Sequence, residues 1–448
     1  MTSSIGRTVN KFEGYAKRDV HSEDTELTHV GPNTPAGEYL RRFWQPVALS
    51  SEVNDLPVAV TILGEELVLF RTLKGELGLL HLHCSHRGAS LEWGIPTAKG
   101  INCCYHGWQY ATDGEILSVP NDPTSTIPAK NRHGAYPLHE YKGIVFTYMG
   151  PPDEVPDFPI YDSYELEDTE MVPFSLHMPC NWLQILENTV DPTHSCFLHT
   201  LMSGIQFAES WQELPQIDFF ESPLGMTSFN VRRWKENLWV RSGDTVLPNM
   251  NQGGSLWEKA ENSKYYLRHA LSRWMRPIDN TNTDIIGWRL FNDKVDPDHQ
   301  GDRDQIGKGK IDFIGQTEDE RSYHERQRVP GDFEAIVSQR PIAVHRMEHL
   351  TGADIGVAML RRLVRRGIRA VKAGKPFMST SKSSNRIIPT YTSDSVLHIP
   401  PHNGAERELM RELGRKVVDV MLKSDHLDPI DREDHFTNEL EAFRQSKF

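Results

Sequence analysis

Two short cysteine–histidine motifs in the first quarter of the chain constrain its fold more than any other feature. They are HCSHRGASL at residues 83–91 and INCCYHGWQY at residues 101–110. Their candidate metal ligands are Cys84, His86, Cys103 or Cys104, and His106. Zinc sites usually use C-x2–4-C and H-x3–5-H spacings. One cysteine and one histidine on each of two loops instead favour a [2Fe-2S] cluster with two cysteines on one iron and two histidines on the other. A zinc ribbon or a chance cluster are the alternatives.

The segment around these motifs has the pattern of an all-β domain. Short apolar and β-branched runs are separated by glycine, which is typical of strands joined by turns. The runs are VAVTILG, ELVLFRT, LGLLHLH and IVFTYMG. The stretch PPDEVPDFP that follows is rich in proline and acids, and it indicates a domain boundary. We therefore predict an N-terminal extension at residues 1–43 and the all-β domain at 44–152.

The rest of the chain mixes helical and strand-like segments. This mixture predicts an α+β domain at residues 153–400 and a C-terminal helical extension at 401–448. The strand-like runs are MTSFNVRRW, NLWVRSG and DIIGWRLF. The predicted helices are NWLQILEN, ADIGVAMLRRLVRRGIRAVKAG and GAERELMRELGRKVVDVMLKS. The first of these must be disturbed at Asp191, because a residue that precedes proline avoids the α region.

A second group of metal-binding residue types lies where that first helix is disturbed. The pattern E-x3-D-x2-H-x4-H is formed by Glu187, Asp191, His194 and His199. Two histidines and a distant carboxylate make the facial triad of non-haem Fe(II) oxygenases, which leaves positions open for O2. On an ideal helix, His194 and His199 would lie about 140° apart. They could reach one iron only if the helix broke or ended between them. Taken by itself, the pair favours two structural histidines.

CSHRGASL and CCYHGWQY together resemble the Rieske signature C-x-H-R-G … C-x-x-H-G-W. The resemblance implies that the cluster ligands are Cys84, His86, Cys103 and His106. Cys104 then occupies a position where the family usually has proline, and we expect it to be a small buried neighbour of the cluster. Ser85 is a second departure, at another position where proline is common. Both departures concern the stiffness of the loops rather than ligation.

The Rieske signature followed by D-x2-H-x4-H resembles the α-subunits of Rieske non-haem iron oxygenases, in the phthalate dioxygenase-like branch. The resemblance covers most of residues 38–370. It implies a helix-grip catalytic domain, made of an antiparallel sheet plus helices, in which His194 and His199 bind iron. It also implies that Asp191 bridges His194 to His106 of the partner subunit's cluster, so that the protein forms a homotrimer.

The third iron ligand must come from far along the chain. The branch has an aspartate shortly before a Q-x-P-I segment and then E-H-L-x-x-x-D, which identifies Asp332 as the predicted ligand. The residues that match the rest of this pattern are Gln339, Pro341, Ile342, Glu348, His349, Leu350 and Asp354. Glu334 is the alternative ligand. Asn188 is expected to hydrogen-bond near the iron or to be a structural helix residue.

The resemblance implies a terminal oxygenase that uses O2 and electrons from NAD(P)H. A flavin and iron–sulfur reductase would deliver the electrons, directly or through a ferredoxin. We expect mono- or dihydroxylation of a small aromatic substrate that carries a carboxylate, with O- or N-demethylation as the alternative. A carboxylate favours an arginine in an otherwise apolar pocket. The candidates are Arg232, Arg233, Arg241 and Arg268. Alternation along a strand puts Arg232 and Arg233 on opposite faces, so at most one of them points inward.

Charge and hydropathy weigh against several other classes of protein. A net charge of -13 argues against general nucleic-acid binding. There is no apolar run of the roughly 20 residues that span a bilayer, and the N-terminus does not resemble a signal peptide. The five cysteines are expected to be thiols or metal ligands in a reducing cytoplasm. An electron-transfer Rieske protein without oxygenase activity and a zinc-stabilised binding module are the alternatives. The basic run at 361–375 is either a docking face for an acidic reductase or ferredoxin, or a solvated helix face or trimer contact.

Overall fold

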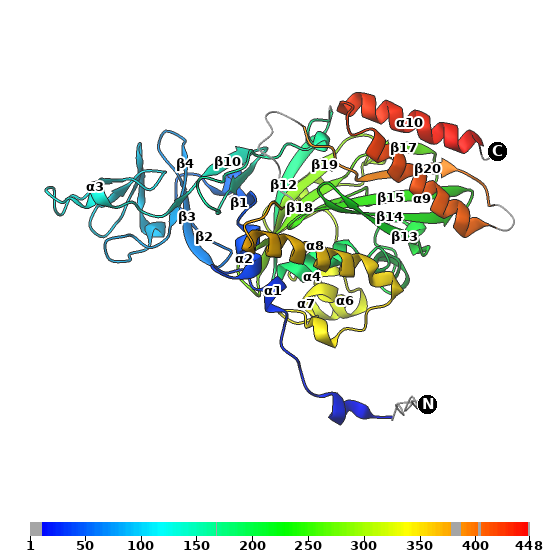
Figure 1. The fold of residues 1–448 in the computed structure, drawn as a ribbon, viewed down its shortest axis with the longest axis horizontal. Coiled ribbons are helices and arrows are strands. Elements are labelled where there is room, and N and C mark those ends of the chain that lie inside the picture. Colours follow the sequence, from blue (N-terminus) through cyan, green and yellow to red (C-terminus); the bar gives the residue numbers. More distant parts are fainter. Residues whose placement is uncertain (1–10, 167, 378–386, 402–404, 447–448) are drawn as a thin grey trace.

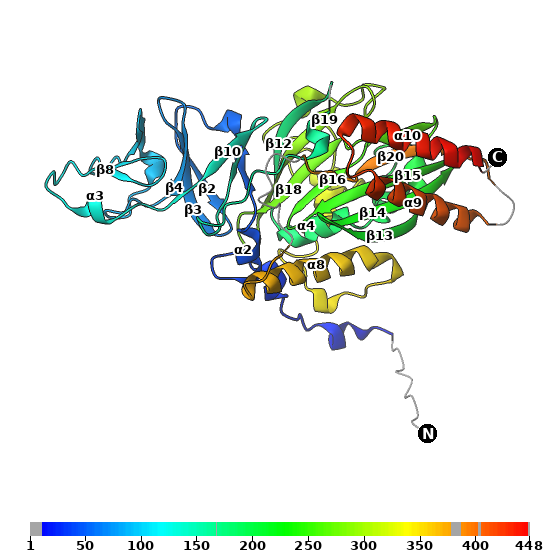
Figure 2. The ribbon, with the colours of Figure 1, turned by 45° about the horizontal axis from the view of Figure 1, so that its top comes forward.

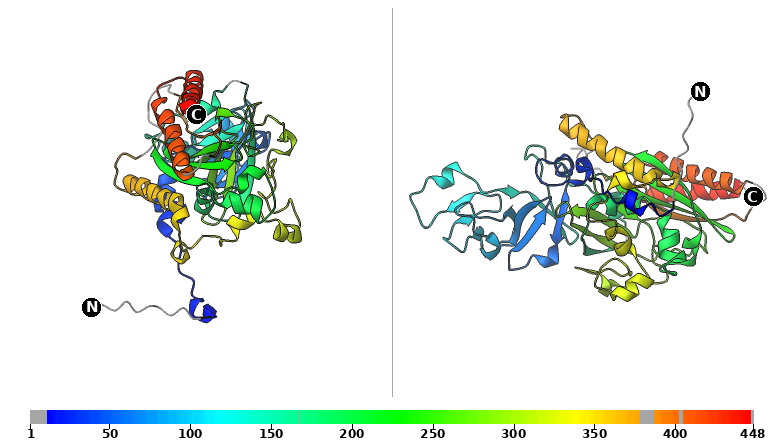
Figure 3. Two further views of the ribbon diagram at one scale, coloured as in Figure 1. Left: turned by 90° about the vertical axis from the view of Figure 1, so that its right-hand side faces the viewer. Right: turned by 90° about the horizontal axis from the view of Figure 1, so that it is seen from below.

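The computed structural model describes residues 11–166, 168–377, 387–401 and 405–446. An all-β domain, drawn in blue and cyan, lies beside a larger domain built on one broad sheet with helices (Figure 1). Seen from below, the all-β domain projects from one end of the larger domain, so the molecule is elongated (Figure 3). This is the predicted fold class. Among the described helices, none combines the length and the apolar character needed to cross a membrane.

The all-β domain consists of three small antiparallel sheets. The first, in the order β1-β11-β10, joins Gln45–Leu49, Ile144–Thr147 and Leu138–Tyr141. The second, in the order β2-β3-β4-β9, joins Val58–Ile62, Glu65–Arg71, Leu77–His81 and Ala135–Tyr136. The third, in the order β5-β6-β7-β8, joins Ile95–Thr97, Gly100–Asn102, Gln109–Tyr110 and Ile116–Ser118. The second and third sheets share a core that includes Val68, Phe70, Leu80, Ile101 and Tyr110. This shared core holds the very short strands of the third sheet in place.

The larger domain is organised by one nine-stranded antiparallel sheet. Its main path is β12-β19-β18-β16-β15-β14-β13, and β20 joins it by pairing with β15 and β17. The first four strands on this path are Glu170–Met178, Thr283–Phe291, Leu271–Pro277 and Met250–Gly253. The next three are Asn237–Val246, Gly225–Trp234 and Gln216–Ser222. Strands β17 and β20 are Lys264–Leu267 and Ser393–His398.

Helices cover both faces of this sheet, and side-chain alternation along the strands separates the two faces. Met226 of β14 packs in the core that contains α4 (Trp182–Thr189) and α8 (Ile355–Lys372). Val231 of the same strand packs in the core of α9 (Glu406–Lys423) and α10 (Pro429–Ser446). Figure 2 shows α8 and α10 on opposite sides of the sheet. The shorter helices are α1 (Thr25–Thr28), α2 (Pro35–Leu40), α3 (Ile127–Lys130), α5 (His194–Cys196), α6 (Tyr323–Arg328) and α7 (Asp332–Val337).

The basic run on α8 is largely paired within the chain. Arg365 and Arg369 form ion pairs with Asp24 and Glu26 beside and on α1. Arg361 binds Glu348 at 2.6 Å. The pairs with Asp24 and Glu26 fasten the N-terminal segment to the larger domain. All three pairs use charge that would otherwise be free to bind a partner.

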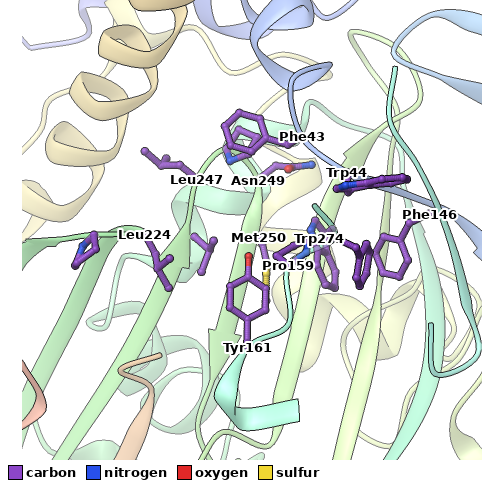
Figure 4. Close-up of a pocket in the computed structure, with 14 residues that line it drawn as sticks. Phe43, Trp44, Phe146, Pro159, Tyr161, Leu224, Leu247, Asn249, Met250 and Trp274 are labelled. Atoms are coloured by element: carbon purple, nitrogen blue, oxygen red, sulfur yellow. The ribbon is translucent and has the colours of Figure 1, made fainter. Parts of the chain in front are cut away.

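An aromatic cavity lies where the two domains meet. Figure 4 shows Trp44 and Phe146 of the all-β domain facing Trp274 of the large sheet, with Tyr161 from the connecting segment nearby. Phe146 and Trp274 make an edge-to-face contact with ring centroids 5.3 Å apart. The lining of this cavity includes none of the predicted metal ligands. We therefore interpret it as part of the domain junction rather than as the site of chemistry.

Candidate metal centres

The two cysteine–histidine motifs form loops with the same backbone hydrogen bonds. In the first loop, the amide of Gly88 donates to the carbonyl of Cys84 at 2.9 Å. In the second, the amide of Gly107 donates to the carbonyl of Cys103 at 3.0 Å. The φ angles of Gly88 and Gly107 are 76° and 73°. Glycine suits both positions because a left-handed backbone is strained for residues with a Cβ.

The predicted cluster ligands converge where these loops meet. The thiols of Cys84 and Cys103 are buried, and the ring centroids of His86 and His106 are 4.5 Å apart. Burial raises the pKa of the Cys84 thiol, and the neighbouring Cys103 adds to this rise. The Nδ1 atom of His86 is buried without a hydrogen-bond partner. A buried nitrogen of this kind has the property expected of a metal ligand, so these residues fit a [2Fe-2S] cluster.

Cys104 corrects one expectation. It is exposed, whereas Cys84 and Cys103 are buried. Cys103 and Cys104 are consecutive in a tight turn, so their side chains point in different directions. The expectation that Cys104 is a buried neighbour of the cluster is therefore wrong.

Two aromatic residues near the cluster loops were not identified from the sequence. The ring of Trp108 stacks on His86 with the two planes 2° apart. The hydroxyl of Tyr110 lies 3.0 Å from Sγ of Cys84. Hydrogen bonds to cluster sulfurs are one of the factors that set the reduction potential. The sequence signal was available, because Trp108 is the last residue of the second motif and Tyr110 lies two residues later, on β7.

The helix that leads to His194 and His199 is disturbed at the predicted position, because α4 ends at Thr189 and Asp191-Pro192 follows. A short helix, α5, then begins at His194 and ends at Cys196, between the two histidines. Residues Phe197–Leu201 then form a π-helical turn. A π turn joins residues five apart by a hydrogen bond, and this change of helical geometry after Cys196 lets His194 and His199 face the same side. Their ring centroids are 5.3 Å apart.

Asp332, the first residue of α7, faces both histidines. Its Oδ1 lies 3.7 Å from Nε2 of His194 and 3.4 Å from Nε2 of His199. Two donor atoms that each stand about 2.1 Å from one metal can be at most about 4.2 Å apart. The three side chains are therefore close enough to share a single ion.

Neighbouring polar groups hold each of these donors. Nδ1 of His194 donates to the backbone carbonyl of Asp191. Nδ1 of His199 lies 2.8 Å from Oε1 of Gln206. The amides of Gln316 and Asn188 donate to Asp332 at 2.8 and 3.3 Å. Metal-bound histidines usually have such a partner on the second ring nitrogen.

The electrostatics of the three side chains suit a divalent cation. Burial alone would raise the pKa of Asp332, but His199 and His194 hold it well below its usual value. Burial lowers the pKa of His194, which favours the neutral imidazole that binds metal. Two imidazoles and a carboxylate with space beside them match the donor set of a non-haem Fe(II) triad.

A cavity adjoins this triad, and its volume, including its opening to solvent, is about 840 Å³. His194, His199 and Asp332 are all part of its lining. A second, shallower hollow lies on the outer side, towards α8. Asn188, Asp191 and His194 line both, so they form the wall between the cavity and the surface hollow.

Two acidic residues of the sequence patterns point away from the triad. Glu187 is bound by the guanidinium of Arg361 at 2.6 and 2.7 Å. Glu334, the alternative ligand, accepts a hydrogen bond from the amide of Gly331 at 2.7 Å and pairs with Arg321 and Arg326. Both carboxylates have structural partners, which leaves Asp332 as the acidic residue beside the histidines.

The four arginine candidates divide between two environments. Arg232 and Arg241 line the cavity, whereas Arg233 reaches across the other face of the sheet to Glu406 of α9. Arg268 is buried beside Asp162 at 2.8 Å and is not part of the lining. The expectation that Arg233 or Arg268 binds the substrate is therefore wrong. Strand alternation places Arg233 on the other face of the sheet, and a buried ion pair holds Arg268 away from the cavity.

The two arginines that do line the cavity are already engaged. Arg232 donates to the carbonyl of Glu213 at 3.1 Å, to Ser195 at 3.1 Å and to Asn230. It therefore braces the segment next to His194. Arg241 pairs with Asp394 at 3.2 Å and donates to the carbonyl of Ser255 at 2.6 Å.

A fifth arginine, Arg273, was not among the sequence candidates and also lines the cavity. It lies on β18 between Leu271 and Met275, which pack in the core on the α4 side of the sheet. The signal was the alternation itself, because a charged residue at the centre of an apolar face of an interior strand calls for an explanation.

Comparisons with known proteins agree with this arrangement. Residues 43–141 match the Rieske [2Fe-2S] domain family, and residues 147–210 match the family described as LigXa C-terminal domain like. The oxygenase subunit of tert-butanol monooxygenase / tert-amyl alcohol desaturase from Aquincola tertiaricarbonis is 40% identical over 97% of both chains. The α-subunit of phenoxybenzoate dioxygenase from Ectopseudomonas oleovorans is 38% identical over 78% of this chain and 86% of its own.

Solved structures give the same fold. Dicamba monooxygenase bound to dicamba superimposes with a TM-score of 0.58 over 75% of this chain and 99% of its own, at 16% identity. At that identity the likeness establishes the fold alone. The names of the sequence relatives show that substrates within the group are not all aromatic. With 40% identity over nearly its whole length to one oxygenase subunit, this chain belongs to the Rieske non-haem iron oxygenases, as the α-subunit that serves as terminal oxygenase.

Proposed function

We propose that this oxygenase hydroxylates a small aromatic substrate held in the cavity beside His199. The observation that carries the proposal is that His194, His199 and Asp332 all line this cavity. Phe207 and Phe313 form part of its wall, with ring centroids 6.0 Å apart, and Phe207 lies 4.8 Å from the ring of His199. Aromatic walls favour a flat ring through stacked and edge-to-face contacts. O- or N-demethylation of an aromatic ether or amine in the same cavity is the second candidate.

The residues around the triad have separate tasks in this proposal. His194, His199 and Asp332 would hold Fe(II), which supplies a centre with open positions for activating O2. Gln206 and the carbonyl of Asp191 keep the Nδ1 atoms of the histidines occupied, so that Nε2 is the free donor. The aromatic wall limits the access of water to the bound substrate.

We also propose that the electrons come from the cluster of a second copy of this chain. Figure 2 shows β8, in the cluster-binding sheet, at the end of the all-β domain remote from the large sheet. The cluster-binding end of one copy therefore points away from the triad of the same copy. Asp191 separates the cavity from the surface hollow, and its Oδ1 accepts from the amide of Thr193 at 3.0 Å. Its Oδ2 has no hydrogen-bond partner in the described part of the chain, and it could accept one from His106 of the partner subunit.

Exposed apolar side chains suit such a contact. Trp93, Ile95 and Tyr105 are 69%, 64% and 57% exposed near the cluster loops. Phe197, Met202 and Leu350 are 45%, 73% and 49% exposed around the surface hollow. One patch on each of two different surfaces makes a head-to-tail contact, and such contacts form a ring where the rotation between copies closes. We propose a homotrimer, supplied with electrons from NAD(P)H by a flavin and iron–sulfur reductase or through a ferredoxin.

Subunit mixing tests the electron path. Cys103→Ser chains, expected to lack the cluster, and Asp332→Ala chains, expected to lack the iron, are each inactive by themselves. Co-assembled trimers should recover turnover if electrons pass between copies. Sequential purification through a different affinity tag on each variant verifies that mixed trimers form. Inactive mixed trimers would overturn the proposed path.

A defined substrate panel tests the reaction. Holoenzyme with a surrogate reductase is given phenoxybenzoate, phthalate, a methoxybenzoate and tert-butanol under isotopically labelled O2. Label in an aromatic hydroxyl group supports ring hydroxylation, and formaldehyde release from the methoxybenzoate supports demethylation. Turnover of tert-butanol with none of the three aromatics would overturn the aromatic substrate class.

A further inference from the structure

Arg273 occupies the same cavity as the triad, and its position is built into the sheet. β18 pairs with β16 on one side and β19 on the other, which makes it an interior strand. Gly287 of β19 lies directly opposite Arg273. A Cβ at position 287 would stand 2.7 Å from Cα and 2.9 Å from Cβ of Arg273. Glycine at position 287 therefore leaves room for the Cα and Cβ atoms of Arg273.

The guanidinium of Arg273 differs from those of the other arginines in the cavity. Its Nε atom is buried without a hydrogen-bond partner. Within the described ranges, its side chain makes no ion pair or hydrogen bond, whereas Arg232 and Arg241 are both satisfied by protein groups. The nearby Asp332 attracts it electrostatically. That carboxylate, however, is already shared between the two histidines and two amides.

Arg273 is half-buried, and its Nε is cut off from water without a partner, which proteins rarely leave for a buried donor. Its planar donors match a carboxylate, which can accept two parallel hydrogen bonds from them. We propose that Arg273 anchors the substrate of this enzyme by binding a carboxylate group on it. Arg273 thus has the substrate-binding role that was expected of the four sequence candidates, which either lie outside the cavity or are already paired with protein groups.

This inference rests on the proposed function, because it names a chemical group of the molecule that enters the same cavity. It adds a specificity that the family as a whole does not have. The carboxylate would bind on the β18 side of the cavity. The remainder of the molecule would then extend along Phe207 and Phe313 towards the histidines.

Binding of benzoate and benzamide to the iron-loaded protein, measured by calorimetry, tests the inference. The two probes have nearly the same shape and differ in charge. Wild type is expected to bind benzoate about 10- to 100-fold more tightly than benzamide, the effect of a charge-assisted pair. Arg273→Gln should remove most of this preference. Arg233→Gln is the matched control, because it removes the same charge from the opposite face of the sheet and should keep the preference.

The wild-type comparison by itself can overturn the inference, whatever the folding of the variants. Equal affinities, or no binding of benzoate at millimolar concentration, would refute a carboxylate anchor. A preference that survives in Arg273→Gln would place the anchor elsewhere. Iron content and the Rieske EPR signal are measured on the same samples. A protein that holds both centres yet does not prefer benzoate would contradict the role of Arg273 without contradicting the oxygenase function.

Discussion

The cluster loops place their four predicted ligands between residues 84 and 106, on two turns closed by equivalent backbone hydrogen bonds. The triad instead combines two histidines from the segment after α4 with Asp332 at the start of α7. The two parts are far apart in the sequence: Asn188, at the end of α4, donates a hydrogen bond to Asp332, which lies 144 positions later. The first centre is thus assembled by local turn chemistry. The second depends on a π-helical turn and on the packing of distant segments. The same chain therefore contains one site encoded by spacing and one created by tertiary structure.

The largest expected effect breaks the local site. Cys103→Ser should abolish the cluster, because a serine hydroxyl does not replace a thiolate, and should leave the mononuclear iron bound. Visible absorption and EPR after dithionite reduction measure the loss. Cys104→Ser is the control, since its side chain is exposed, and it should retain the full signal. Loss of the cluster in Cys104→Ser would contradict the assignment.

The second substitution removes a ligand of the triad, the site formed by distant segments, and leaves the cluster loops intact. Asp332→Ala should lose the mononuclear iron and nearly all turnover, with an unchanged Rieske signal. Glu334→Ala is the matched control. It removes the cap of α7, which costs about 1 kcal/mol in the free energy of unfolding, but should keep the iron. Iron per chain, compared with acid-labile sulfide, separates the two sites, and iron retained in Asp332→Ala would exclude it as a ligand.

A smaller effect is expected when a residue that supports the triad is changed. Gln206 accepts from His199 and also donates to the carbonyl of Pro330 at 3.2 Å, so it connects both parts of the triad. Gln206→Leu should weaken iron binding by about 10- to 100-fold. Competition with a chelator measures this affinity. Gln300→Leu at an exposed position should bind iron like wild type, and equal affinities in the two variants would rule out a role for Gln206.

The smallest effect concerns the tuning of the cluster. Tyr110→Phe removes the hydroxyl that lies 3.0 Å from Sγ of Cys84. A hydrogen bond to sulfur stabilises the reduced cluster, so its loss should lower the midpoint potential. The expected shift is about 40 mV, the one-electron equivalent of a net hydrogen bond of about 1 kcal/mol. Potentiometric titration followed by EPR measures it, and an unchanged potential would show that this hydroxyl does not tune the cluster.

Much of the fold could be predicted from the sequence, because strand and helix periodicity is a local property. The all-β segment, the helix at Ile355–Lys372 and the helix at Glu406–Lys423 were each visible as patterns. The π-helical turn at Phe197–Leu201 was not, since the sequence required only that the helix break or end between His194 and His199 and did not show how. Exposure of Cys104 was also missed, because the direction of a side chain within a tight turn depends on its φ and ψ angles.

The sequence by itself determined the residue types of both metal centres, the loops of the cluster and the family to which the chain is similar. Only the tertiary structure decided which charged side chains face the cavity. Arg233 and Arg268 found partners elsewhere, Arg232 and Arg241 became braces, and Arg273 was left facing the cavity without a partner. The physical reason is that ligation motifs follow short chain spacings, whereas the pairing of a buried charge depends on residues that only folding brings together.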